Sequence, residues 1–338
     1  MFNFLQNWHL IHCSFFSLTA NLLTIAILIR GNCGLSKCVT CYLVAMATAD
    51  VLVIILEVIF KQIPHVYLGV FVNLMQSIYV CHIHFALLQT AKYCSVWFTI
   101  IFTFDRFVAI CCSKLKSKYC TTKIASVTLG SVTVLSCLLN VFWCFFLTGA
   151  YNFSISLWFC LYTPEFVSFL HWAVVEFINY IINPCVPFVL IILLNVLTVR
   201  HILVSSRARK RLRVQTSGQS RKDPEMENRR KSIVLLFAVS ANFILLWVLI
   251  LIYSIWNRLA FSGYTHAYID SKWFKLGSML QLMSCCTNTC IYAMTQSKFR
   301  EQWKRALIYP FSRIMKFLQW FKWRGISNCD NVNVWFSV

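Results

Sequence analysis

The sequence predicts an all-α membrane protein: a bundle of seven transmembrane helices followed by a juxtamembrane amphipathic helix. Three observations lead to this fold class. The 338 residues are 59% hydrophobic and only 12% charged, whereas a soluble domain carries about 25% charged residues. Seven apolar stretches are long enough to span a bilayer. Most basic residues lie in alternate connections between those stretches, which is typical of membrane helices.

The predicted spans follow one another with short polar connections. In chain order they are Leu10–Ile29, Lys37–Phe60, Ser77–Ile110, Ile124–Leu147, Phe169–Leu203, Ser232–Trp256 and Phe274–Thr295. Many of the 17 cysteines lie inside these spans, where cysteine acts as a small hydrophobic residue. The cysteine content therefore does not indicate a disulfide scaffold.

The basic residues predict the orientation of the bundle. Of the 31 Lys and Arg residues, 26 lie after spans one, three, five and seven. The positive-inside rule then puts the C-terminus in the cytoplasm and the N-terminus outside, in a multi-pass protein of the plasma membrane. A net charge of +20 on a soluble fold would suggest nucleic acid. Here the charge follows the membrane topology, so we expect the lipid bilayer, and no nucleic acid, as a partner.

The chain divides into four predicted segments. A short extracellular N-terminus covers 1–9, the transmembrane domain covers 10–297, an amphipathic helix covers 298–309, and a basic aromatic cytoplasmic tail covers 310–338. The N-terminus lacks the basic start of a signal peptide, so we expect the first span to be retained. Between spans five and six, the polar and basic stretch 205–230 predicts a flexible loop with helical extensions at both ends.

Asp105, Arg106 and Phe107 close the third span. An acid and an arginine at the edge of a membrane helix are costly to place there, so they are usually functional. The alternative is a structural ion pair whose side chains extend to water. Together with Cys81 at the other end of the span, the triplet resembles that of rhodopsin-like (class A) G-protein-coupled receptors. The resemblance implies a signalling receptor, not an enzyme, that acts on a heterotrimeric G protein.

The resemblance extends from about Leu18 to Leu307 and implies roles for particular residues. Those implied for G-protein coupling and switching are Asp105, Arg106, Phe107, Asn195, Phe243, Trp247, Asn288 and Tyr292. Leu249 and Thr289 stand where the family has prolines, and Asn195 stands where it has a tyrosine. In Thr289, in Asn195 and in the pair Leu246-Trp247 the chain is similar to orphan receptors thought to sense tryptophan and phenylalanine, although those receptors keep the proline that Leu249 replaces. Those receptors carry an arginine where this chain has Ile250.

Asp50 lies in the middle of the second span. A carboxylate at that depth is costly unless it is paired or hydrated. The resemblance implies that Asp50 binds an allosteric Na⁺ together with Ser95, Ser284 and Asn288. The alternative is a neutral, hydrogen-bonded Asp50 that links helices. We expect no other cofactor or metal.

Lys92 predicts a polar pocket in the third span, four helical turns from Asp105. A buried lysine without a partner loses its proton, and the candidate partners are Glu57 and Glu176. The predicted ligand pocket contains Glu57, Gln89, Lys92, Tyr93, Glu176 and Trp247. It would take a small molecule or a short peptide. The alternative is an ion pair that only holds helices together.

The resemblance also implies a disulfide between Cys81 and Cys160. The tripeptide Asn152-Phe153-Ser154 is a glycosylation candidate, provided that its loop is extracellular. Two other functions remain open. One is a receptor-like protein that no longer couples, and the other is a transporter whose pathway is lined by the intramembrane charges. A transporter usually shows an internal repeat of spans, which this sequence lacks. The sequence also contains no HExxH or GxSxG motif of a hydrolytic enzyme.

Overall fold

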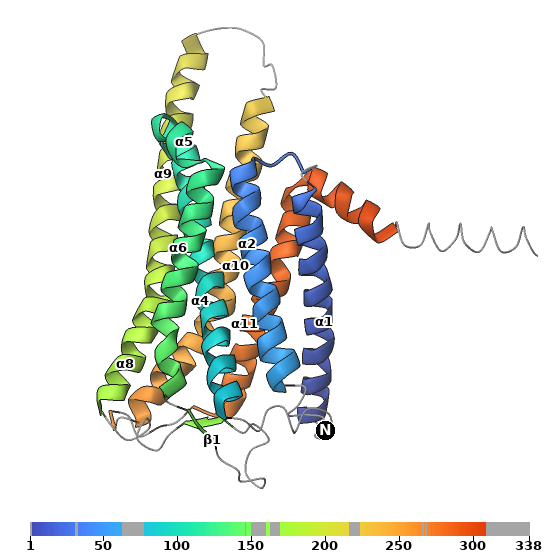
Figure 1. Cartoon of the computed structure of the whole chain (residues 1–338). Coiled ribbons are helices and arrows are strands. Elements are labelled where there is room, and N and C mark those ends of the chain that lie inside the picture. The colour runs from blue at the N-terminus through green and yellow to red at the C-terminus, as the bar shows by residue number, and fades with distance from the viewer. Residues whose placement is uncertain are drawn as a thin grey trace, which may run out of the picture.

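The helices run side by side in one bundle (Figure 1). The computed structural model describes residues 2–30, 33–62, 78–145, 147–149, 160–162, 170–215, 224–261, 263–264, 267 and 269–308. In chain order, the α-helices of the long helical runs are α1 (Phe2–Ile29), α2 (Lys37–Ile54), α4 (Ile78–Cys111), α6 (Thr122–Asn140), α8 (Leu170–Tyr180), α9 (Val186–Gln215), α10 (Pro224–Phe261) and α11 (Ser271–Thr295). The π-helical η1 (Ile55–Gln62) continues α2, and the 3₁₀ turn η2 (Val141–Phe145) continues α6. The π-helical η3 (Ile181–Cys185) joins α8 to α9 in one run. These runs correspond to the seven predicted spans.

Side-chain caps explain where several helices begin. The Ser36 hydroxyl accepts the Val39 N–H at the start of α2, and Thr121 caps α6 in the same way, each at 3.3 Å. Asp270 accepts the Lys272 N–H at 2.9 Å and starts α11. Such caps satisfy backbone donors that have no partner inside the helix.

The structure corrects several predicted boundaries. The first helix already begins at Phe2 rather than at Leu10, so most of 1–9 belongs to α1. The fifth span is not one regular helix: Asn183 has non-helical φ and ψ angles, and Pro184 follows it between α8 and α9. The sixth predicted span, Ser232–Trp256, is confirmed as a helix, and this helix, α10, extends further at both ends.

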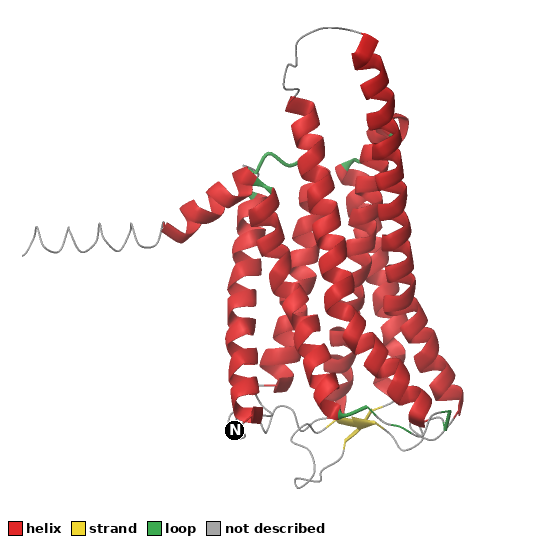
Figure 2. Ribbon diagram, turned by 180° about the vertical axis from the view of Figure 1, so that it is seen from behind, coloured by secondary structure: helices red, strands yellow, loops and turns green. Residues whose placement is uncertain are grey.

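The two ends of the bundle differ. Strands β1 (Leu147–Gly149) and β2 (Cys160–Tyr162) pair antiparallel at the end where α1 begins, which we call the sheet end (Figure 1). At the other end, called the Arg106 end, lie the short helix α5 (Ser113–Tyr119) and a helix over 297–308. This last helix points away from the bundle (Figure 2), in the place predicted for the amphipathic helix.

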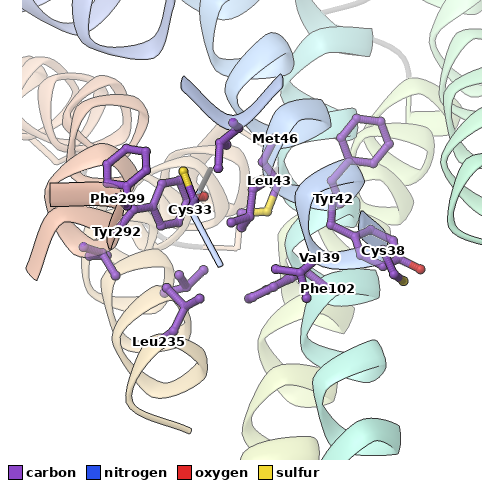
Figure 3. Packing of buried hydrophobic residues seen from close by; sticks show 14 of the residues in the cluster. Cys33, Cys38, Val39, Tyr42, Leu43, Met46, Phe102, Leu235, Tyr292 and Phe299 are labelled. Atoms are coloured by element: carbon purple, nitrogen blue, oxygen red, sulfur yellow. The ribbon is translucent and has the colours of Figure 1, made fainter. Parts of the chain in front are cut away.

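Helix α4 lies at the centre of the bundle, where it contacts α2, α6, α9 and α10. Near the Arg106 end, α2 and α4 share a hydrophobic core with α10 and α11. Figure 3 shows this core, with Tyr292 against Phe299 and with Phe102 among the residues of α2. Phe102 and Phe299 are fully buried. The core therefore fixes the half of α4 near the Arg106 end against its neighbours.

The outward faces of the helices are apolar. Leu138 and Leu245 are exposed by 66% and 68%, which suits lipid rather than water. Six of the described helical runs are long and apolar enough to cross a membrane. The seventh, α11, carries more polar residues and packs extensively on α10. The chain is therefore a multi-pass membrane protein.

We expect Gly277→Ala to destabilise the bundle. A Cβ at Gly277 in α11 would lie 3.0 Å from the Ile250 backbone of α10, and overpacking of this kind costs about 1–3 kcal/mol. The midpoint of thermal unfolding in detergent should fall. Gly130→Ala in α6 is the control, because a Cβ there meets nothing within 4 Å. An equal fall in both variants would contradict close packing between α10 and α11.

Candidate functional site

One stripe of α4 faces the interior of the bundle and carries the polar residues Lys92, Ser95, Thr99 and Arg106. Its members recur every three or four residues, the spacing that places side chains on one face of a helix. In order from the sheet end they are Leu88, Lys92, Ser95, Thr99, Phe102 and Arg106. Lys92 and Ser95 are partly buried, and Thr99, Phe102 and Arg106 are buried. The stripe links a charged group near the sheet end with another at the Arg106 end.

Lys92 pairs with Glu57. Its Nζ lies 3.0 Å from Glu57 Oε2, and the two side chains are only 18% and 10% exposed. Glu57 lies in η1, the π-helical continuation of α2, and the neighbouring Leu56 carbonyl contacts His84 Nε2 at 2.8 Å. Of the two predicted partners of Lys92, the structure therefore brings Glu57 to it.

Glu176 pairs instead with Arg258. The Arg258 Nε lies 3.0 Å from Glu176 Oε2, and the Tyr180 hydroxyl donates to Glu176 Oε1 at 2.6 Å. This ion pair links α8 to α10 near the sheet end. Arg258 was not among the residues singled out from the sequence, where it counted only as one of the few basic residues on the outer side. No pattern within α10 could reveal its partner, because the two residues meet only through the fold.

The other predicted pocket residues are Tyr93 and Gln89 on α4 and Trp247 on α10. The Tyr93 hydroxyl donates to Asn179 Oδ1 and so links α4 to α8. Trp247 donates from Nε1 to Ser284 Oγ at 3.1 Å and lies against Phe243. Gln89 is partly buried on α4. Within the described part of the chain, no hydrogen bond connects Gln89 to the two ion pairs.

Asp50 binds polar groups from two other helices. Ser95 donates to Oδ1 at 2.8 Å, and Asn288 donates through Nδ2 to Oδ2 at 2.9 Å. Asp50 is only 1% exposed. Ser284, the fourth residue predicted for the sodium site, donates instead to the Gln281 carbonyl at 2.6 Å, as well as accepting from Trp247. Three of the four predicted residues therefore meet directly.

Asp50 and Asn288 suit a hard monovalent cation. Among the residues that the structure describes, no basic side chain pairs with Asp50, and its carboxylate is stabilised by hydrogen bonds from neutral groups. A buried carboxylate with hydroxyl and amide oxygens nearby matches the oxygen ligands that hard cations prefer. Asp50, Ser95 and Asn288 would hold such a cation, which would supply the positive charge that the site lacks.

At the Arg106 end, Arg106 turns back onto its neighbour. Its guanidinium bonds Asp105 Oδ2 through Nε at 3.0 Å and through Nη2, and lies 6.0 Å from the centre of the Phe102 ring. Both residues are less than 10% exposed. Tyr292 is buried nearby on α11, in edge contact with Phe299. The charged pair is thus closed and shielded from water.

The remaining candidates are not joined to this pair. Phe107 is partly buried on α4, and Asn195 on α9 is partly buried with an Oδ1 that has no hydrogen-bond partner among the described residues. Cys81 is disulfide-bonded, and Cys160 lies in β2. The pairing of these two cysteines stays a prediction. Asn152 and the tail 310–338 lie outside the described residues.

A comparison with protein families decides what this arrangement belongs to. The family model described as 7 transmembrane receptor (rhodopsin family) matches residues 20–292. The chain belongs to this family of receptors. A search of curated proteins gave no significant match. Family membership gives the receptor a role in signal transduction, with a ligand and a G protein as the general partners of the family, and the family is not one of enzymes.

We expect the Lys92–Glu57 pair to behave as a coupled unit. Removing one partner of a buried ion pair costs about 3–5 kcal/mol, whereas removing both can be nearly neutral. Lys92→Met and Glu57→Gln should each lower the midpoint of thermal unfolding, and the double variant should recover most of the loss.

The matched control for Lys92→Met is Lys272→Met, whose ion pair with Asp270 is largely exposed. If the two single losses simply added in the double variant, the pair would not act as a unit.

Proposed function

We propose that this receptor binds a small extracellular ligand in the half of the bundle near the sheet end and activates a heterotrimeric G protein through Arg106. The observation that carries the proposal is the placement of Lys92 and Arg106 on one face of one helix. They are 14 residues apart in the sequence, which corresponds to about 21 Å along α4. A ligand at one end and a G protein at the other would therefore contact the same rigid element.

The charges near the sheet end favour a zwitterionic ligand. Lys92–Glu57 and Arg258–Glu176 are each neutral as a pair. A ligand with a single charge would leave one buried protein charge unpaired, which costs several kcal/mol. A ligand that carries both a carboxylate and an ammonium group can exchange partners with a protein pair and leave no charge unpaired. Amino acids and short peptides have this chemistry, and Arg258 offers a cation for the carboxylate.

Signalling would proceed by a shift of populations. The closed Asp105–Arg106 pair belongs to a state in which the G-protein site is shielded. A ligand that binds the alternative state more tightly, with α10 displaced at the Arg106 end, would shift the equilibrium toward it. Arg106 would then leave Asp105 and contact the G protein. In this proposal the receptor resides in the plasma membrane with its sheet end outside.

We expect Arg106→Ala to abolish G-protein dissociation in cells, measured across a panel of Gα subunits with and without tryptophan and phenylalanine. Lys92→Met should abolish only the response to the ligand. Arg30→Ala and Lys272→Met are the controls, because they remove exposed charges at the same two ends of the bundle. Silence of the wild-type receptor despite surface expression would favour a receptor-like protein that does not couple.

We also propose that Na⁺ binds at Asp50 and stabilises the state with the closed Asp105–Arg106 pair. Replacing choline chloride by NaCl should then raise the stability by about 1.4 kcal/mol at a tenfold excess of Na⁺ over its Kd. Thermal unfolding measures this rise, which should vanish in Asp50→Asn and persist in Asp270→Asn, a change of an exposed carboxylate. Equal rises in all three proteins would mean that salt acts elsewhere.

A further inference from the structure

Two cysteine thiols contact Asp105 from outside its own helix. Cys38, in the first turn of α2, donates from Sγ to Asp105 Oδ1 at 3.4 Å. Cys120, which ends α5, donates from Sγ to the Asp105 backbone carbonyl at 3.8 Å. No role was assigned to either residue from the sequence. Both residues lie at the Arg106 end of the bundle, Cys38 in the first turn of α2 and Cys120 between α5 and α6.

The two carboxylate oxygens of Asp105 bind different partners, one on its own helix and one on α2. Oδ2 accepts the Arg106 guanidinium, whereas Oδ1 accepts the Cys38 thiol. Asp105 is only 5% exposed, so water has little access to replace a lost donor. A buried charged oxygen that loses a donor raises the free energy of the state that buries it. That state is the one in which Arg106 is closed onto Asp105.

The packing of Cys38 in the core fixes the orientation of its thiol. The side chain is 2% exposed and lies with Phe102 and Tyr42 in the hydrophobic cluster that Figure 3 shows. The Ser36 cap fixes the first turn of α2 two residues earlier. The thiol is therefore held toward α4 by packing and by the helix start.

Cys120 acts from the connection between α5 and α6. Burial, followed by the nearby charge of Asp105, raises the pKa of the Cys120 thiol to about 11. At neutral pH the group is therefore a protonated donor and a poor nucleophile. Its N–H also bonds the Lys116 carbonyl at 3.0 Å, which fixes the end of α5.

We propose that Cys38 and Cys120 are positioning residues that hold Asp105 in the closed pair with Arg106 and thereby set the basal activity of the receptor. The two thiols attach α2 and the α5–α6 connection to the end of α4. Loss of the Cys38 donor weakens the closed state and leaves the charge of Arg106 in place. This inference rests on the proposed function of Arg106 and concerns the groups that restrain it.

The test compares variants of nearly equal volume. Cys38→Val removes the donor and keeps the bulk, whereas Cys38→Ser keeps a donor. Cys41→Val, one turn later in α2, removes a thiol that does not contact Asp105 in the described structure. Basal G-protein dissociation should rise about two- to fivefold in Cys38→Val. This range is what we expect for the loss of one hydrogen bond to a charged group, since a thiol is a weaker donor than an N–H or O–H group. Cys38→Ser and Cys41→Val should stay near the wild type.

A second measurement does not depend on coupling. Hydrogen–deuterium exchange of the receptor in nanodiscs should become faster over 112–121 in Cys120→Val, because the Cys120 thiol holds this segment to the Asp105 backbone carbonyl. Exchange should become faster over 37–41 in Cys38→Val, because the Cys38 thiol holds the first turn of α2 to Asp105 Oδ1. The rates should rise less in Cys120→Ser and in Cys38→Ser, which keep a donor. Cys38→Val should add little to the effect of Asp105→Ala, since both remove the bond between Cys38 Sγ and Asp105 Oδ1.

Three results would overturn the inference. The first is wild-type exchange and wild-type basal signalling in Cys38→Val, and the second is an equal rise in Cys38→Ser. The third is a full additional effect of Cys38→Val in the Asp105→Ala background. Arg106→Ala, measured in parallel, separates the two proposals. If Arg106→Ala abolishes signalling while Cys38→Val changes nothing, the proposed function stands and the role of Cys38 fails.

Discussion

The cost of burying charge in a membrane bundle determines how this receptor is built. Each charged or polar side chain inside the bundle needs a partner, because lipid supplies no hydrogen bonds. Lys92 meets Glu57, Arg258 meets Glu176, and Arg106 meets Asp105. The first two pairs join different helices, so the charges also fix how the helices sit together. The charged residues inside the bundle therefore hold the helices in the arrangement that the structure shows.

Helix α4 collects most of these contacts. It contacts η1 through Lys92, α8 through Tyr93 and α2 through Ser95. At the Arg106 end, Asp105 accepts a hydrogen bond from a thiol of α2. The hydrophobic core around Phe102 lies between the polar contacts and keeps the helix in place. A displacement of one end of α4 would therefore shift several helices, which suits a protein that transmits a signal along the length of the bundle.

The sequence predicted the elements better than their partners. Span lengths and apolar composition were enough for the seven-helix bundle, and the resemblance led to the meeting of Asp50 with Ser95 and Asn288. The choice of Glu57 over Glu176 for Lys92, and the pairing of Glu176 with Arg258, depend on how helices are rotated and tilted, which no local pattern contains. The same holds for Cys38 and Cys120. Asn183 and Pro184 interrupt the fifth span because of a local backbone conformation that apolar length does not reveal.

The uninterrupted course of α10 has a consequence for how the receptor can evolve. This helix extends from Pro224 to Phe261 with Leu249 in place of a kinking proline, a length of about 57 Å at 1.5 Å per residue. Because α10 has no proline kink at position 249, a substitution near Arg258 changes the tilt of the whole helix. The end of α10 near Leu235 must then accommodate this change of tilt. Compensating substitutions should therefore appear at opposite ends of α10, so that sequence covariation among near relatives would join its two ends rather than cluster around position 249.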